Sequence, residues 1–425
     1  MGFFIRKRGV KRYETGELLF CRQAQGKQMI DRISELTGIE AEPAGNMLTF
    51  KKKGVELSFA AFGTEDEGEA GVYAKRELNG VCGYFRQVEA KSEDIQRNLL
   101  YMLKQCQGVV RVNYSFEQKG ERANREKTAI ADRLIGEILR GIGGMLTRGG
   151  EAIVGTNGRV ILDGSGSSEV KTYLPPLEEI TGEQKKGIPR EALERRKGSV
   201  MNLRRHQIYT PLWLPVIETE REAEKRTKRQ VCGRAVALLT VALYSECLLG
   251  EQMEVGKARR FVQENMEHFR VEEFLSPAER QYLYDDFSEE AVRIHFSWQY
   301  ENLYVMEWAL GLFDRLDWPN HICDVETCVR KIREFDSFEE FVKASSLRSH
   351  KELLSAADFI YRLHWACVDA RINGFSSPGG ADNEVVMERH RSLFWAAGCK
   401  GAEDGKQELL VSDKSCGWDK VNLST

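Results

Sequence analysis

The chain contains 425 residues, of which 42% are hydrophobic and 30% are charged, and its formal net charge at pH 7 is −3. A chain of this length forms two or three globular domains, and its hydrophobic content excludes wholesale disorder. The nearly neutral charge excludes a strongly basic nucleic-acid-binding protein. Because we find neither a long uncharged apolar run nor the apolar stretch of a signal peptide, we expect a cytoplasmic protein without a membrane partner.

Two parts of the chain differ in composition. All seven tryptophans lie at or after Trp213 and all seven histidines lie at or after His206, whereas 24 of the 38 glycines precede residue 173. Residues 173–189 are rich in charge, proline and glycine, which is typical of a linker. The sequence therefore predicts an α+β domain over 1–172, a linker over 173–189 and an all-α domain over 190–425.

The first domain is predicted to be α+β with antiparallel hairpins. Asn157-Gly158 between two apolar runs is a strong signal for a two-residue hairpin. Gly141-Ile142-Gly143-Gly144 resembles the start of a dinucleotide-binding loop, but it follows a helical pattern, so we interpret it as a helix end. The predicted elements, in chain order, are helix 27–37, strands 46–50 and 55–62, helix 92–105, strand 109–116, helix 127–146 and the hairpin at 157–158. No catalytic constellation occurs among them, so a binding or assembly role is expected.

The second domain is predicted to be a bundle of helices. Ser276-Pro277-Ala278-Glu279 has the pattern of a capping box with proline at the first helical position. Ser349 and Glu352 repeat the box. Hydrophobic periodicity predicts helices over 219–248, 254–268, 277–286, 288–314, 324–334, 337–345, 349–373 and 384–397.

Signatures of metal and cofactor sites are not apparent. The ten cysteines are scattered without a CxxC pair, and the nearest two, Cys323 and Cys328, are accompanied by His321 and Asp324. Zinc sites more often show two clustered pairs, so we expect reduced cysteines in a cytosolic core. Phosphate-binding loops, zinc-protease and nucleophile-elbow motifs also do not occur. We predict no cofactor and no bound metal.

Several charged residues project from apolar helix faces. In helix 349–373 a narrow polar stripe holds Asp358, Arg362 and Asp369, while His364 and Arg371 lie on the apolar arc. A buried charge without a partner costs several kcal/mol, so such charges are expected to pair.

Two further helices predict the partners of these charges. Glu301 lies on the buried face of helix 288–314, and Arg234 lies at the edge of the apolar face of helix 219–248. We expect Glu301 to contact Arg234, Arg362 or Arg371. A set at the start of the last helix is also expected to join this cluster, namely Glu388, Arg389 and His390.

Two interpretations of this polar cluster remain open. In the first, the charges form a structural network that fixes the register of the helices. In the second, carboxylates and a histidine converge on a pocket, where they would perform acid–base chemistry or bind an anion. The ten candidates are Arg234, Glu301, Asp358, Arg362, His364, Asp369, Arg371, Glu388, Arg389 and His390.

The same helices carry a family resemblance. The sequence over roughly 190–425 resembles family 4272 of the domains of unknown function. The segments that carry it are RQVCGRAVALL (229–239), SWQYENLYVMEWALGL (297–312), LLSAADFIYRLHWACVDARING (353–374), VVMERHRSLFW (385–395) and WDKV (418–421). The resemblance implies a bacterial intracellular helical domain and supplies no activity, and the first 172 residues show no resemblance of this kind.

Three functions follow as hypotheses. The favoured one is a non-enzymatic interaction or regulatory protein, with a protein partner or self-association. The alternative is a hydrolase-like enzyme or small-anion binder that uses the polar cluster. Nucleic-acid binding by Lys225, Arg226, Lys228 and Arg229 is not expected, because glutamates at 218, 220, 222 and 224 flank these bases and dilute their field.

Overall fold

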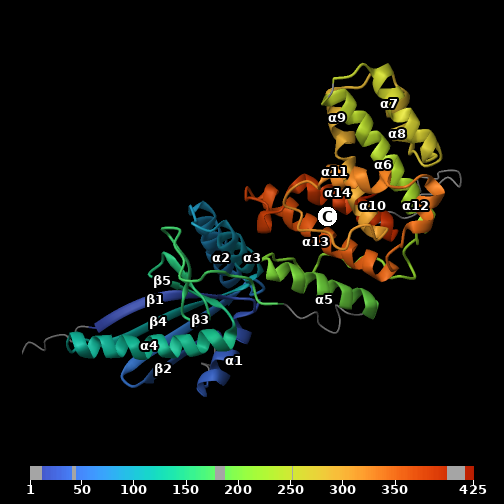
Figure 1. Cartoon of the computed structure of the whole chain (residues 1–425). Coiled ribbons are helices and arrows are strands. Elements are labelled where there is room, and N and C mark those ends of the chain that lie inside the picture. Colours follow the sequence, from blue (N-terminus) through green and yellow to red (C-terminus); the bar gives the residue numbers. More distant parts are fainter. Residues whose placement is uncertain (1–11, 41–44, 178–186, 251, 400–416) are drawn as a thin grey trace, which may run out of the picture. The chain divides into compact units, whose positions relative to one another are not determined.

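The computed structural model describes residues 12–40, 45–177, 187–250, 252–399 and 417–425. The chain divides into two compact units, Met1–Pro176 and Leu177–Thr425, and each is described by itself (Figure 1). Residues 178–186 of the expected linker lie outside the described residues.

The first unit contains a seven-stranded antiparallel sheet with the order β2-β3-β4-β1-β5-β6-β7. The long central strands β1 and β4 pair over their whole length, from Arg12 opposite Glu117 to Cys21 opposite Gly108. The strands are β1 (Arg12–Cys21), β2 (Met47–Lys52), β3 (Val55–Gly63), β4 (Gly108–Glu117), β5 (Met145–Arg148), β6 (Ala152–Val154) and β7 (Val160–Asp163).

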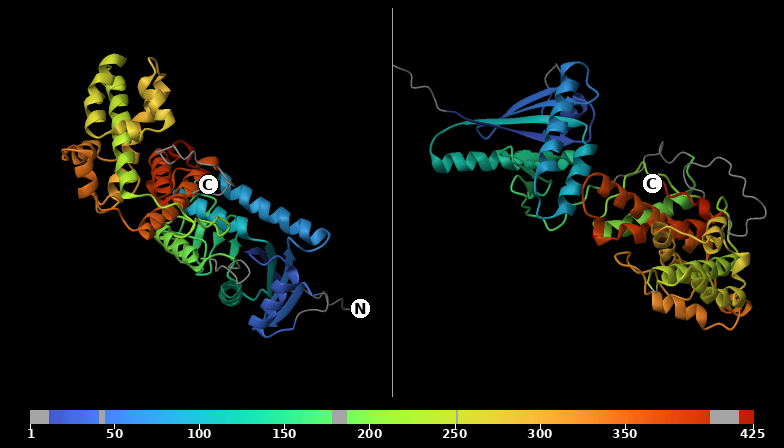
Figure 2. Two further views of the ribbon diagram at one scale, coloured as in Figure 1. Left: turned by 90° about the vertical axis from the view of Figure 1, so that its right-hand side faces the viewer. Right: turned by 90° about the horizontal axis from the view of Figure 1, so that it is seen from above.

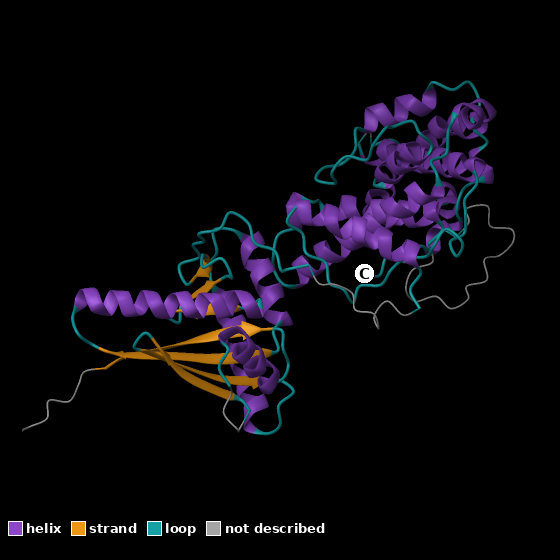
Figure 3. Cartoon of the chain, turned by 90° about the horizontal axis from the view of Figure 1, so that it is seen from below, coloured by secondary structure: helices purple, strands orange, loops and turns teal. Residues whose placement is uncertain are grey.

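Helices cover both faces of this sheet. On one face, α1 (Gly26–Thr37) and α4 (Glu121–Ile142) bury Ile33 and Ile135 against the apolar side of the strands. Figure 3 shows α4 running alongside the strands. On the other face α2 (Glu69–Gln87) packs on β3, and α3 (Glu93–Gln105) packs against α2 and β7.

The predicted α+β class with antiparallel hairpins is confirmed, although three elements were missed and both ends of α4 were misplaced, since it begins at Glu121 rather than at 127. Strands β1 and β5 and helix α2 had no prediction, because β1 is largely polar and α2 contains three glycines in its interior and buries few side chains. Helix α4 ends at Ile142, and Gly143 adopts a left-handed φ of 74°. The chain then enters β5, so the helix predicted to run to residue 146 was too long.

The described part of the second unit, residues 187–425 with their gaps, contains helices without strands (Figure 2). This confirms the predicted all-α bundle. Its main helices are α5 (Arg190–Arg205), α6 (Lys228–Leu249), α7 (Val255–His268), α8 (Pro277–Tyr284), α9 (Glu290–Ser297), α10 (Gln299–Ala309), α11 (Val325–Arg333), α12 (Phe338–Ala344), α13 (His350–Ile372) and α14 (Asn383–Ala397).

Three helix predictions need correction. Helix α5 was missed, because its charged sequence resembles a linker. Helix α6 begins at Lys228 rather than near 219, because Thr227 and Gln230 form a capping box that fixes its start. The single helix predicted over 288–314 is two helices that meet at Trp298, and the second of them ends at Ala309.

Helix α6 is also the one described helix that is long and apolar enough to cross a membrane, judged by length and composition only. In the structure, 89% of its most apolar stretch is buried inside the protein. The helical core therefore accounts for its apolar character, since all-round hydrophobicity is equally typical of a central helix.

Candidate functional site

The polar cluster consists of separate ion pairs and small hydrogen-bond networks. Arg234 on α6 and Glu279 on α8 form an ion pair in which both side chains are 1% exposed. Arg234 also donates to the Phe274 carbonyl at 3.2 Å, and its guanidinium lies over the Trp418 ring. Glu279 accepts from the Ser276 N–H at 2.8 Å as part of the predicted capping box. One carboxylate thus caps a helix and neutralises a buried arginine.

A second pair joins α10 to α14. The Glu301 carboxylate accepts from Arg389 Nε at 2.6 Å, and its other oxygen accepts from the Cys323 N–H at 2.8 Å. Arg389 further donates to the Asp317 carbonyl and lies over the Tyr304 ring. Both charges are enclosed, and each has partners beyond the other.

A third pair lies within α13. Arg362 donates to Asp358 through Nε at 3.0 Å and Nη2 at 2.8 Å, and neither residue is exposed. Arg362 also donates to the Pro215 carbonyl at 3.1 Å, which ties the chain before α6 to this helix. The predicted spacing of four residues therefore produces a buried bidentate bond.

Glu388 belongs to a polar network between α10 and α14. Its carboxylate accepts from Asn302 Nδ2 at 2.7 Å and from Arg391 Nε at 3.2 Å. The Ser392 hydroxyl donates to the side-chain oxygen of Asn302. Glu388 is 2% exposed, so its charge too is neutralised inside the bundle.

The two histidines contact each other. His364 Nδ1 on α13 and His390 Nδ1 on α14 are 2.8 Å apart, so one ring donates to the other. Burial lowers the pKa of His364 to about 4, and burial followed by the neighbouring His364 lowers the pKa of His390 well below its usual value. The pair is consequently neutral near pH 7. Within the described residues, His390 Nε2 has no hydrogen-bond partner.

The remaining two candidates are less buried than the other eight. Arg371 is exposed near the end of α13, where its charge adds to the effect of burial on the pKa of His364, and Asp369 is only partly buried. The expectation that Glu301 contacts Arg234, Arg362 or Arg371 is wrong. Each of those arginines lies elsewhere, and Arg389, which was expected to join the cluster, takes the place opposite Glu301.

Among the described residues of the helical unit, sequence reasoning missed three buried charges. Glu279 was read only as a cap, although its position at the third residue of α8 also faces the core. Arg196 lies on the unpredicted helix α5, where burial lowers its pKa to about 10. Glu307 on α10 is not exposed and lies beside the Cys328 thiol, and burial raises its pKa well above the usual value.

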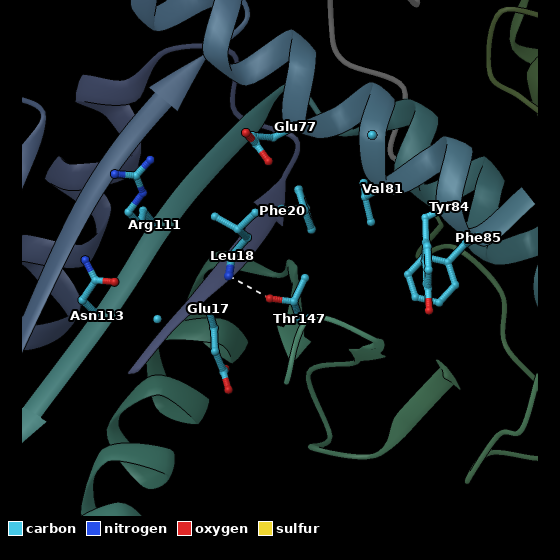
Figure 4. A pocket seen from close by; sticks show the side chains of 13 residues that line it. Glu17, Leu18, Phe20, Glu77, Val81, Tyr84, Phe85, Arg111, Asn113 and Thr147 are labelled. Carbon is cyan, nitrogen blue, oxygen red and sulfur yellow. Dashed lines mark hydrogen bonds between the residues drawn. The ribbon is translucent and has the colours of Figure 1, made fainter. Parts of the chain in front are cut away.

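The second of three described cavities borders the cluster, because Pro215, whose carbonyl accepts from Arg362, lines it together with Tyr361 and Phe394, whose rings contact His390. Three hollows of about 590, 350 and 180 Å³ are lined by described residues, and none of the ten candidates lines any of them. The largest, shown in Figure 4, lies in the first unit between α2 and the strands β1 and β4. Arg111, Asn113 and Glu77 form its polar wall, and Leu18, Phe20, Val81 and Phe85 form much of its apolar wall.

The structure also places the residues considered for metal and nucleic acid. No group of three or more potential metal ligands occurs among the described residues. In the basic stretch at the start of α6, Lys228 donates to the Ser345 carbonyl at 3.0 Å and Arg229 pairs with Glu339 at 2.9 Å. Arg226 lies over the Trp395 ring. These cations are therefore engaged within the chain.

Comparison with known proteins gives one match. A family model described as Domain of unknown function (DUF4272) matches residues 195–421, which is more than half of the 425 residues. No curated protein and no solved structure matches the chain. The matched span contains α6 to α14 and η3 (Trp418–Lys420), so it carries every ion pair described above.

Proposed function

We propose that this chain, which belongs to the DUF4272 family, is a non-enzymatic interaction or regulatory protein whose helical unit is a rigid body. The observation that supports this proposal is the enclosure of the polar cluster in separate pairs, each with its own partners. Groups that perform acid–base chemistry must reach a substrate in a cavity. Here the charges satisfy one another inside the bundle instead.

The alternative is a hydrolase-like enzyme or small-anion binder built on the same residues. It would need a histidine or a carboxylate to exchange protons with a bound molecule. His390 is not exposed and its Nδ1 is occupied by His364, which is itself 8% exposed. Glu301 and Asp358 are each bound to an arginine. These contacts favour a structural role for the cluster.

Location and partners belong to the same proposal. We place the protein in the bacterial cytoplasm, because its buried thiols, such as Cys232 and Cys328, are unpaired, as is usual in a reducing compartment. The first unit, which has a broad sheet and no equivalent buried charge network among its described residues, is then the part that carries the contact with a protein partner or a second copy.

The test separates structure from chemistry. The double variant His364→Leu with His390→Leu removes the two groups most suited to acid–base work while preserving apolar volume. If it folds, we expect it to restore the phenotype of a strain lacking the gene as well as the wild type does. The matched control is His268→Leu, an exposed position. A double variant that folds normally and still fails to restore the phenotype would contradict the proposal.

A further inference from the structure

The cavity of about 590 Å³ in the first unit lies between α2 and the strands β1 and β4 (Figure 4). Sites for small molecules have volumes of roughly 300–1,000 Å³, so this cavity is large enough for one. Helix α2 leaves the space open at Gly80, which lines it and has no side chain. Outside the helix itself, no atom lies within 4 Å of the position that a Cβ would take there.

Much of the wall of the cavity is apolar. It is formed by side chains of β1 and α2, namely Leu18, Phe20, Val81, Tyr84 and Phe85. Figure 4 shows Tyr84 and Phe85 together at one end, and their rings meet edge to face with centroids 5.0 Å apart. Tyr84 is 42% exposed, so an apolar group that entered this end would remove ring surface from water.

The other end of the cavity carries an arginine that is held in position. Arg111 projects from β4 at the end away from Tyr84, and Glu77 of α2 lies at the same end (Figure 4). Arg111 Nη2 donates to the Tyr73 hydroxyl at 3.0 Å, and the guanidinium lies over the Tyr73 ring. Among the described residues Arg111 has no ion pair, so its other donors are available to an anion in the cavity.

Two further polar groups at this end have bonding capacity left. Arg76 donates to Glu77 Oε1 at 2.9 Å, and within the described chain Glu77 Oε2 has no partner. The half-buried side-chain amide of Asn113 also has no hydrogen bond there. Gly16 faces Asn113 in the ladder between β1 and β4, and a Cβ at Gly16 would collide with Asn113 Oδ1. The missing side chain therefore makes room for this amide.

We propose that the cavity binds a free α-amino acid with an apolar side chain. A guanidinium and a carboxylate that do not pair with each other, beside an apolar wall, complement a zwitterion joined to an apolar group. The ligand carboxylate meets Arg111 and Asn113, its ammonium group meets Glu77, and its side chain extends toward Tyr84.

The spacing along α2 agrees with this orientation. Glu77 and Tyr84 are seven residues apart, so they lie on the same face of the helix and roughly 10 Å apart along its axis. That span accommodates an aromatic amino acid together with the hydrogen bonds at its polar end. This site in the first unit goes beyond the proposed function, which was argued from the helical unit.

The first experiment tests the class of ligand by isothermal titration calorimetry of the full chain. The probes are L-phenylalanine, L-leucine, 3-phenylpropionate, which lacks the ammonium group, and phenethylamine, which lacks the carboxylate. We expect both amino acids to bind, and L-phenylalanine to bind roughly tenfold more tightly than either analogue, because each analogue loses charge-assisted hydrogen bonds. Absence of binding by both amino acids overturns the proposal, as does equal binding of L-phenylalanine and 3-phenylpropionate.

The second experiment tests the location. Gly80→Leu fills the cavity without meeting another atom and replaces a helix glycine by a better helix former, so it should fold stably and lose L-phenylalanine binding. The matched control is Gly83→Leu. Gly83 lies on the same helix with the same free space around it but does not line the cavity, so this variant should bind normally. Binding that survives Gly80→Leu, or that is lost equally in both variants, overturns the assigned site.

The third experiment assigns the two charges. Glu77→Gln should weaken L-phenylalanine binding roughly tenfold and leave 3-phenylpropionate binding unchanged, whereas Arg111→Gln should weaken both. Glu69→Gln, at an exposed position of α2 outside the cavity, should change neither. Unchanged L-phenylalanine binding in Glu77→Gln and Arg111→Gln overturns the proposal. None of these outcomes bears on the histidine double variant, so the cavity and the proposed function fail separately.

Discussion

Asp358 and Arg362 show how charge is held inside the helical unit. Neither is exposed, and two hydrogen bonds join them. Desolvation of two charges can cost as much as their attraction returns, so such a pair contributes little net stability. Removal of one partner is different, because it leaves a buried charge uncompensated. The buried pairs therefore act mainly by destabilising any other arrangement of the helices, because such an arrangement would separate the charges.

A stability measurement tests this asymmetry. Asp358→Asn leaves Arg362 unpaired, and we expect it to lower the free energy of unfolding by about 3–5 kcal/mol. The double variant Asp358→Leu with Arg362→Met should recover most of this loss, because it removes both charges. Urea denaturation followed by tryptophan fluorescence measures both. Glu339→Gln, in an exposed pair with Arg229, should change little. Equal losses in the single and double variants would refute the argument.

The histidine pair should make stability depend on pH. The folded-state pKa of His364 is lowered to about 4 and that of His390 is also lowered, so an unfolded chain binds more protons than the folded one below about pH 6.5. The free energy of unfolding should therefore fall as the pH falls from 6.5 toward 4. The His364→Leu, His390→Leu double variant should lose less stability over that window. A difference between the two proteins that is constant with pH would contradict this.

Helix ends and docked segments decide the structure at the scale of elements. The Ser276 capping box starts α8 and directs Glu279 toward Arg234, so a local signal also positions a core ion pair. The segment at Trp418 packs against the same ion pair. The Trp418 ring lies 5.0 Å from the Arg234 guanidinium and 5.9 Å from the Trp395 ring, and Trp418 is 3% exposed. A short 3₁₀ turn thereby covers the end of a buried pair.

Truncation of Trp418 tests the contribution of this segment. Trp418→Ala should lower the free energy of unfolding by about 3–5 kcal/mol, because it removes a large buried ring and exposes Arg234. Trp213→Ala is the matched control, since Trp213 is 70% exposed and its loss should have a much smaller effect. Denaturant unfolding of both variants measures the difference. Similar losses in the two would show that the segment is not part of the cooperative core.

At the scale of the whole molecule, the chain is two compact units with separate cores. All seven tryptophans lie in the second unit, so tryptophan fluorescence reports on that unit alone, whereas far-ultraviolet circular dichroism reports on both units. The composition difference along the chain thus provides a probe of each unit within the intact protein.

This difference allows a test of independence. Phe59→Ala removes a fully buried ring from the sheet and should destabilise the first unit by about 3–5 kcal/mol. Circular dichroism should then show an earlier first transition on heating, while the fluorescence transition stays in place. Phe341→Ala, in the helical core, should have the converse effect. Joint movement of both transitions would show that the two units unfold as one.

Local signals in the sequence determined the fold class and many of the elements. Caps at Ser276 and Ser349, the Asn157-Gly158 turn and apolar periodicity act within a few residues, so they can be read without the fold. Elements with weak local signals were missed. Helix α2 has glycines and charged residues in place of a continuous apolar face. Strand β1 lacks a clear alternation of apolar and polar residues and is held in the sheet by its neighbouring strands.

The sequence also indicated that Glu301 and Arg234 would be buried, since they lie on or beside apolar helix faces, although Arg371, expected on such a face, is exposed. Only the tertiary structure decided their partners. A helical projection gives the direction of a side chain about its own axis, but which guanidinium lies opposite depends on the crossing of two helices. Arg389 meets Glu301 because α14 packs on α10, and Glu279 meets Arg234 because the first turn of α8 lies against α6. Those contacts join residues far apart in the chain, and no local pattern specifies them.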